Sequence, residues 1–159
     1  MFDTVFGLPL HPLVVHATVV FVPAAVLALL VAALWPRFRR WAGPAPLVLA
    51  VIALILVPIS TQSGESLENT LGRSALIEQH SAYADGLLPW MAGAVVVAFG
   101  VWWWRQSERT AAGRFGRLPR WLSGVLVAAA VIVTAGTTVQ VVLIGHSGAE
   151  AAWGDAGAA

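Results

Sequence analysis

The chain has 159 residues, of which 58% are hydrophobic and only 11% are charged, and its mean hydropathy is +0.80. In soluble domains about a quarter of the residues are charged, so this composition excludes an ordinary water-soluble protein. The absence of cysteine excludes disulfides, thiolate zinc sites, iron–sulfur ligation and covalent haem attachment, and the net charge of +1 conceals a strong charge asymmetry along the chain.

Four apolar stretches are long enough to cross a bilayer, because a helix of about 20 residues spans the roughly 30 Å hydrocarbon layer. They cover about residues 12–35, 44–60, 83–104 and 121–144. No basic residue precedes the first stretch, so we expect a retained helix and not a cleaved signal peptide. The sequence therefore predicts an all-α fold, an integral membrane four-helix bundle, in which residues 1–159 form a single domain and residues 147–159 a flexible tail. No convincing internal repeat is visible.

The arginines predict the orientation of this bundle. Eight of the nine lie between the first and second stretches or between the third and fourth, whereas seven of the eight acidic residues lie on the other side. Because positive residues stay in the cytoplasm, both termini are expected to be extracytoplasmic. We interpret the basic loop 105–120 as a topology signal that contacts anionic lipid, and not as a nucleic-acid site.

We therefore expect a multi-pass protein in the lipid bilayer of a bacterial plasma membrane. All nine basic residues are arginine, and alanine and glycine are abundant, which favours a GC-rich bacterial genome. Homo-oligomerisation is left open by the sequence.

All four histidines, His11, His16, His80 and His146, are candidate ligand-binding residues. Counting about 1.5 Å per residue from the cytoplasmic helix ends places all four near the outer edge of the hydrocarbon layer. Five residues turn a helix by about 140°, so His11 and His16 are not both expected to face the bundle interior. Because Pro12 disfavours a helical conformation at the residue before it, we expect His11 above the bundle and His16 on the first helical turns.

Two kinds of bound group suit such histidines. Two imidazoles from different helices can hold a b-type haem, and the leading prediction pairs His16 with His80 or His146. The alternative is zinc or copper, held by these three histidines together with Glu65 or Glu78.

A third alternative is a structural or assembly subunit without cofactor, in which the histidines only cap helices. No catalytic residue is predicted, because nothing marks Ser63 or Ser147 as an activated nucleophile. The sequence therefore favours an electron-transfer or binding module over an enzyme.

Four segments carry a resemblance to a known family. They read GLPLHPLVVH at residues 7–16, SGESLE at 63–68, IEQH at 77–80 and IGHSGA at 144–149. Over nearly its whole length the chain resembles the bacterial family called domain of unknown function 2231 (DUF2231). The resemblance implies a four-span membrane domain related to small b-type cytochromes, with a haem-binding or redox role carried here by the four histidines. It also implies a respiratory-chain or Rieske-type redox protein as partner.

Overall fold

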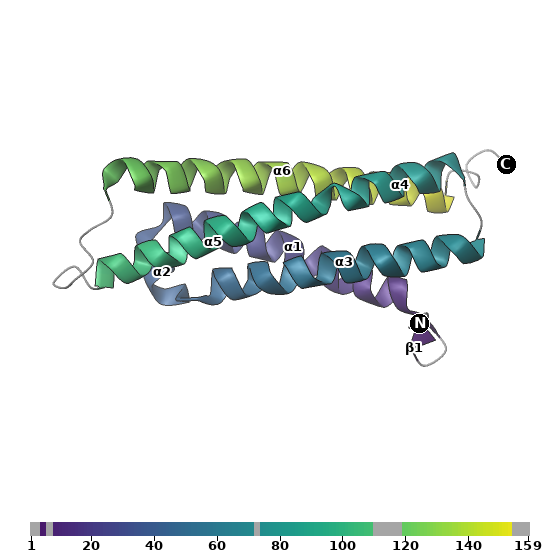
Figure 1. The fold of residues 1–159 in the computed structure, drawn as a ribbon, viewed down its shortest axis with the longest axis horizontal. Coiled ribbons are helices and arrows are strands. Elements are labelled where there is room, and N and C mark those ends of the chain that lie inside the picture. Colours follow the sequence, from purple (N-terminus) through teal and green to yellow (C-terminus); the bar gives the residue numbers. More distant parts are fainter. Residues whose placement is uncertain (1–3, 6–7, 72–73, 110–118, 154–159) are drawn as a thin grey trace.

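The structure is a computed structural model that describes residues 4–5, 8–71, 74–109 and 119–153. Within these residues the chain is almost entirely helical (Figure 1). The elements in chain order are β1 (Thr4–Val5), β2 (Leu8–Pro9), α1 (Leu10–Leu34), α2 (Pro36–Ala42), α3 (Ala45–Leu71), α4 (Ala75–Asp85), α5 (Leu87–Arg109) and α6 (Arg120–Trp153). The two short strands pair antiparallel with each other just before α1.

Four helical segments of the described chain are long and apolar enough to cross a membrane. They are Leu10–Leu34, Ala45–Asn69, Ala75–Arg109 and Arg120–Trp153, so each predicted stretch lies inside or nearly inside one of them. Large apolar side chains such as Val20, Val96 and Ile132 are exposed on the outside of the bundle, where lipid would cover them. The predicted all-α membrane bundle is therefore confirmed.

Two helices extend further than the hydropathy pattern indicated. Helix α3 continues to Leu71, well past residue 60, and α6 continues through Ser147 to Trp153. Residues 147–153 of the expected flexible tail are thus helical, and residues 154–159 lie outside the described part. Hydropathy marks only the length that fits the hydrocarbon layer, whereas good helix formers such as Ala149, Glu150 and Ala151 continue a helix beyond it.

The bundle places α1 against α3 and α6, and α5 against the same two helices. At one end of the long axis lie the start of α1, the end of α3, α4 and the end of α6; at the other lie α2, the end of α5 and the start of α6 (Figure 1). The core between the helices consists mainly of small or medium apolar side chains such as Ala50, Ala53, Met91 and Ala130, all fully buried. Small residues let membrane helices approach closely.

The third membrane crossing is broken at Gly86, between α4 and α5. Pro89 explains the position of the break, because a proline ring clashes with the carbonyl four residues earlier, here that of Asp85, and offers it no N–H. The side-chain amide of Gln140 on α6 donates a hydrogen bond to the carbonyl of Tyr83. This contact fixes α4 beside α6 although the crossing is not one continuous helix.

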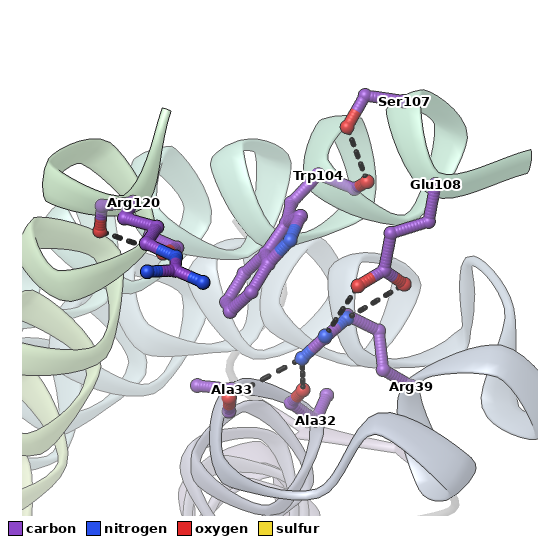
Figure 2. A network of polar contacts seen from close by, with 8 residues as sticks. Ala32, Ala33, Arg39, Trp104, Ser107, Glu108 and Arg120 are labelled. Carbon is purple, nitrogen blue, oxygen red and sulfur yellow. Dashed lines mark hydrogen bonds and ion pairs between the residues drawn. The ribbon is translucent and has the colours of Figure 1, made fainter. Parts of the chain in front are cut away.

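Opposite to α4, the arginine-rich end of the bundle is held by Arg39 of α2, whose side chain is only 2% exposed. Figure 2 shows its guanidinium reaching the carbonyls of Ala32 and Ala33 and the carboxylate of Glu108. The same guanidinium lies 3.7 Å from the ring centroid of Trp104. Arg39 thus satisfies carbonyls at the C-terminal end of α1 and connects α2 with α5.

Candidate functional site

A cavity of about 500 Å³ lies between the helices at the end of the bundle that carries α4. Its inner part is apolar and includes the buried residues Val22, Val57 and Leu87. Its polar lining residues are His11, Thr18, Ser60, Thr61, Glu65, Glu68, His80, Ser81 and Asp85. The volume lies within the range of small-molecule and cofactor sites, about 300 to 1,000 Å³, and we refer to this space as the histidine cavity.

His11 enters the histidine cavity from the first turn of α1 and contacts α3. Its Nδ1 lies 3.2 Å from the backbone oxygen of Ser60 and 3.2 Å from Oγ of Ser63. The hydroxyl of Ser63 in turn donates to the same Ser60 oxygen, at 2.9 Å. The imidazole is therefore anchored through Nδ1 at two oxygens of one helical turn.

His80 is anchored in the same way, from α4 onto α6. Its Nδ1 lies 3.2 Å from the backbone oxygen of Ile144 and 3.2 Å from Oγ of Ser147. The Ser147 hydroxyl donates to the Ile144 oxygen at 3.2 Å, and the Ser147 side chain is only 3% exposed. Both imidazoles line the histidine cavity.

A glycine follows each of these serines and lies against the edge of the imidazole. A Cβ atom on Gly64 would be 3.1 Å from Cε1 of His11, and a Cβ on Gly148 would be 3.0 Å from Cε1 of His80. Both separations are tighter than ordinary van der Waals contact. A larger residue at either position would therefore have to displace the ring.

The two halves of the chain consequently repeat one arrangement. In each, a histidine on the first helix contacts a carbonyl on the second helix, the serine three residues after that carbonyl, and the glycine that follows the serine. No internal repeat is visible in the sequence, because the shared residues are few and are separated by connections of different length. The repeat is one of geometry, with α1 and α3 corresponding to α4–α5 and α6.

His16 and His146 share this end of the bundle but are not among the residues that line the histidine cavity. His16 is exposed, and its Nδ1 contacts the carbonyl of Pro12 on its own helix. His146 is 73% exposed, and its Nε2 lies 3.3 Å from a carboxylate oxygen of Glu150. The structure therefore does not bring His16 together with His80 or His146, the pairs predicted for a haem.

The helix boundaries explain this difference. Because α1 begins at Leu10, His11 lies within the helix and takes its inward face, and not the position above the bundle that Pro12 suggested. Pro12 is tolerated because it falls in the first turn, where its missing N–H has no helical partner to lose. His16, about 140° further round, then points outward.

The predicted metal ligands are likewise only partly gathered. Glu65 lines the histidine cavity with His80, whereas Glu78 is exposed on α4 and is not one of its lining residues. Within the described part of the chain, no three histidine, aspartate or glutamate side chains are grouped so that they could hold a metal ion.

Ser63 and Ser147 are functional candidates, although nothing in the sequence marked either of them as an activated nucleophile. Their contacts with histidine do not resemble an activated serine, because each hydroxyl donates to a backbone oxygen and not to the imidazole. A sequence signal did exist, since a Ser–Gly pair stands near the end of the second and of the fourth long helix, and a histidine near the start of the first and of the third.

A family model described as "Predicted membrane protein (DUF2231)" matches residues 7–158, which is nearly the whole chain. No curated protein and no solved structure shows significant similarity to it.

Proposed function

The chain belongs to the DUF2231 family of predicted membrane proteins, and from this premise and the geometry of the histidine cavity we propose that it is a small membrane redox module that binds haem b between His11 and His80. The proposal keeps the bis-histidine haem predicted from the sequence and changes one ligand, because His11 and not His16 lies in the cavity with His80.

The observation that supports the proposal most strongly is the equal anchoring of the two imidazoles. A backbone oxygen only accepts hydrogen bonds, so Nδ1 of each ring donates to it and Nε2 keeps its lone pair. Histidine ligands of metals typically donate their other ring N–H to a carbonyl or carboxylate in this way. The two rings also come from different helices, α1 and α4, as in the bis-histidine haem predicted from the sequence.

The size and lining of the histidine cavity favour haem over a bare metal ion. The porphyrin supplies four ligands to its iron, so two protein ligands suffice, whereas structural zinc takes four and catalytic zinc three. In the described residues no third histidine or carboxylate completes such a set around His80. The apolar inner wall suits a macrocycle, and Gly64 and Gly148 leave the ring edges uncrowded. Bound haem would supply one-electron chemistry.

The membrane side on which the histidine cavity lies is proposed from the charge distribution. The described arginines Arg37, Arg39, Arg40, Arg105, Arg109 and Arg120 lie on α2, at the end of α5 and at the start of α6, at the end opposite the histidine cavity. By the positive-inside rule the cavity then faces the extracytoplasmic side of a bacterial plasma membrane. There the module would pass electrons between a quinone or respiratory subunit and an extracytoplasmic partner, for which a Rieske-type protein is our candidate.

Absorption spectroscopy of the protein purified in detergent, with its haem and metal content, tests the proposal. We expect a Soret band that shifts on reduction, either as purified or after titration with haemin. His11→Ala and His80→Ala should each abolish the six-coordinate low-spin spectrum.

The chain contains its own matched controls, since His16 and His146 lie at the same end but outside the histidine cavity. His16→Ala and His146→Ala should leave the spectrum unchanged. The proposal would be overturned if saturating haemin gave no shift of the Soret band with the wild-type protein. Stoichiometric zinc or copper would then indicate the metal-binding alternative. A protein without any cofactor, in which no histidine variant loses more than about 1 kcal/mol of stability, would be a structural subunit.

A further inference from the structure

Ser63 and Ser147 occupy equivalent positions in the two halves, and both contact the anchored nitrogen of a cavity histidine. Each hydroxyl has two neighbours in the structure, the backbone oxygen three residues earlier and the Nδ1 of the imidazole. The same triangle of oxygen, hydroxyl and ring nitrogen thus occurs twice, on α3 and on α6.

The position of each hydrogen in this triangle follows from which of the three atoms can donate. The backbone oxygen accepts only, and it receives the serine hydroxyl hydrogen at 2.9 Å on α3 and 3.2 Å on α6. The serine oxygen therefore presents a lone pair to Nδ1, 3.2 Å away in both cases. Both neighbours of Nδ1 are acceptors, so the ring proton is held on Nδ1 between them.

The backbone oxygen alone would hold this proton less firmly. Inside a helix, the oxygens of Ser60 and Ile144 also accept from the N–H four residues later, so the imidazole competes for an acceptor that is already in use. The serine oxygen adds a second acceptor, and two acceptors define both the tautomer and the rotation of the ring.

We propose that Ser63 and Ser147 are positioning residues, which hold His11 and His80 in the Nδ1–H tautomer and thereby make Nε2 the ligand atom of both rings. The inference rests on the proposed function for the identity of the group that Nε2 binds, whereas the tautomers themselves can be measured without any bound group.

The experiment is ¹⁵N NMR of the protein labelled at its histidine rings, in micelles, without haem and at a pH where the rings are neutral. The ring-nitrogen shifts distinguish Nδ1–H from Nε2–H. We expect His11 and His80 to be mainly Nδ1–H, and the exposed His146, whose Nε2 faces Glu150, to serve as an internal reference for Nε2–H.

Ser63→Ala should raise the Nε2–H fraction of His11 several-fold and leave His80 unchanged, and Ser147→Ala should do the reverse. Ser63→Thr, which keeps a hydroxyl, should restore the wild-type ratio. Ser81→Ala is the control, because Ser81 lines the histidine cavity without a hydrogen bond to either ring among the described contacts. Cavity histidines found mainly as Nε2–H, or tautomer ratios that do not respond to the serine variants, would overturn the inference.

A second measurement separates this inference from the haem proposal. If the protein binds haem, loss of the serine acceptors should make both imidazoles weaker donors to the iron, so that the double variant shows a midpoint potential shifted to more positive values. An unchanged potential in a haem protein would contradict the role of the serines. A protein that fails to bind haem but shows the predicted tautomers would reject only the proposed cofactor.

Discussion

Nη2 of Arg39 lies 2.8 Å from Oε1 of Glu108, and this ion pair joins α2 to α5 at the arginine-rich end of the bundle. Glu108 is the one acidic residue on that side of the sequence. Because Arg39 is nearly fully buried, its positive charge must be stabilised by this carboxylate and by the carbonyls of Ala32 and Ala33.

Arg39→Ala is therefore expected to lower the free energy of unfolding by about 3 to 5 kcal/mol, because it leaves the carboxylate and two helix-end carbonyls without their donor. Unfolding by SDS in mixed micelles, followed by circular dichroism, measures this. Arg37→Ala is the control, since Arg37 is exposed on the same short helix and should change stability by no more than about 0.5 kcal/mol. Equal effects of the two variants would show that Arg39 does not stabilise this end.

Gly136 on α6 allows the indole of Trp90 to lie directly against the helix backbone. A Cβ at this position would be 2.3 Å from two ring carbons, so Gly136→Ala should cost about 1 to 3 kcal/mol through forced displacement of the indole. Gly124→Ala on the same helix is the matched control, because no atom lies within 4 Å of its added Cβ. The same unfolding assay should find this control neutral or slightly stabilising, and a neutral Gly136→Ala would mean that α5 and α6 pack less closely than described.

Gly64→Ala and Gly148→Ala test the shape of the histidine cavity. Each added methyl would press on a ring Cε1, at 3.1 Å for His11 and 3.0 Å for His80, so we expect the ring to move by a few tenths of an ångström. Haemin titration should then show weaker binding and a partly high-spin spectrum. Gly124→Ala is the control, because this glycine is not among the lining residues and no atom lies within 4 Å of its added Cβ, so binding should be retained. Full affinity in all three variants would exclude close packing of the glycines on the rings.

The orientation in the membrane can be measured by cysteine labelling, since the chain has no cysteine of its own. Glu78→Cys, on the exposed side of α4, should react with a membrane-impermeant maleimide in intact cells. Arg40→Cys, exposed on α2, should react only after permeabilisation. The opposite pattern would place the histidine cavity in the cytoplasm and would remove the basis for an extracytoplasmic redox partner.

Much of the fold follows from the sequence without knowledge of any tertiary contact. Hydropathy over about 20 residues is enough to identify a crossing, because the bilayer imposes its thickness on each helix separately. The charge asymmetry likewise depends only on which residues flank each crossing. Helix ends were less predictable, and the long extension of α3 to Leu71 shows that a helix does not stop where the apolar run stops.

The candidate site could not be predicted from any one helix, because its residues come from several helices. That His11 and not His16 lines the cavity with His80 follows from the rotation of α1 about its axis, which is set by its packing against α3 and α6. The partners of the rings are also remote in sequence, with separations of 52 positions from His11 to Ser63 and 67 positions from His80 to Ser147. Composition and periodicity therefore determined the membrane bundle, whereas only the packing of four helices determined which imidazoles and which hydroxyls meet.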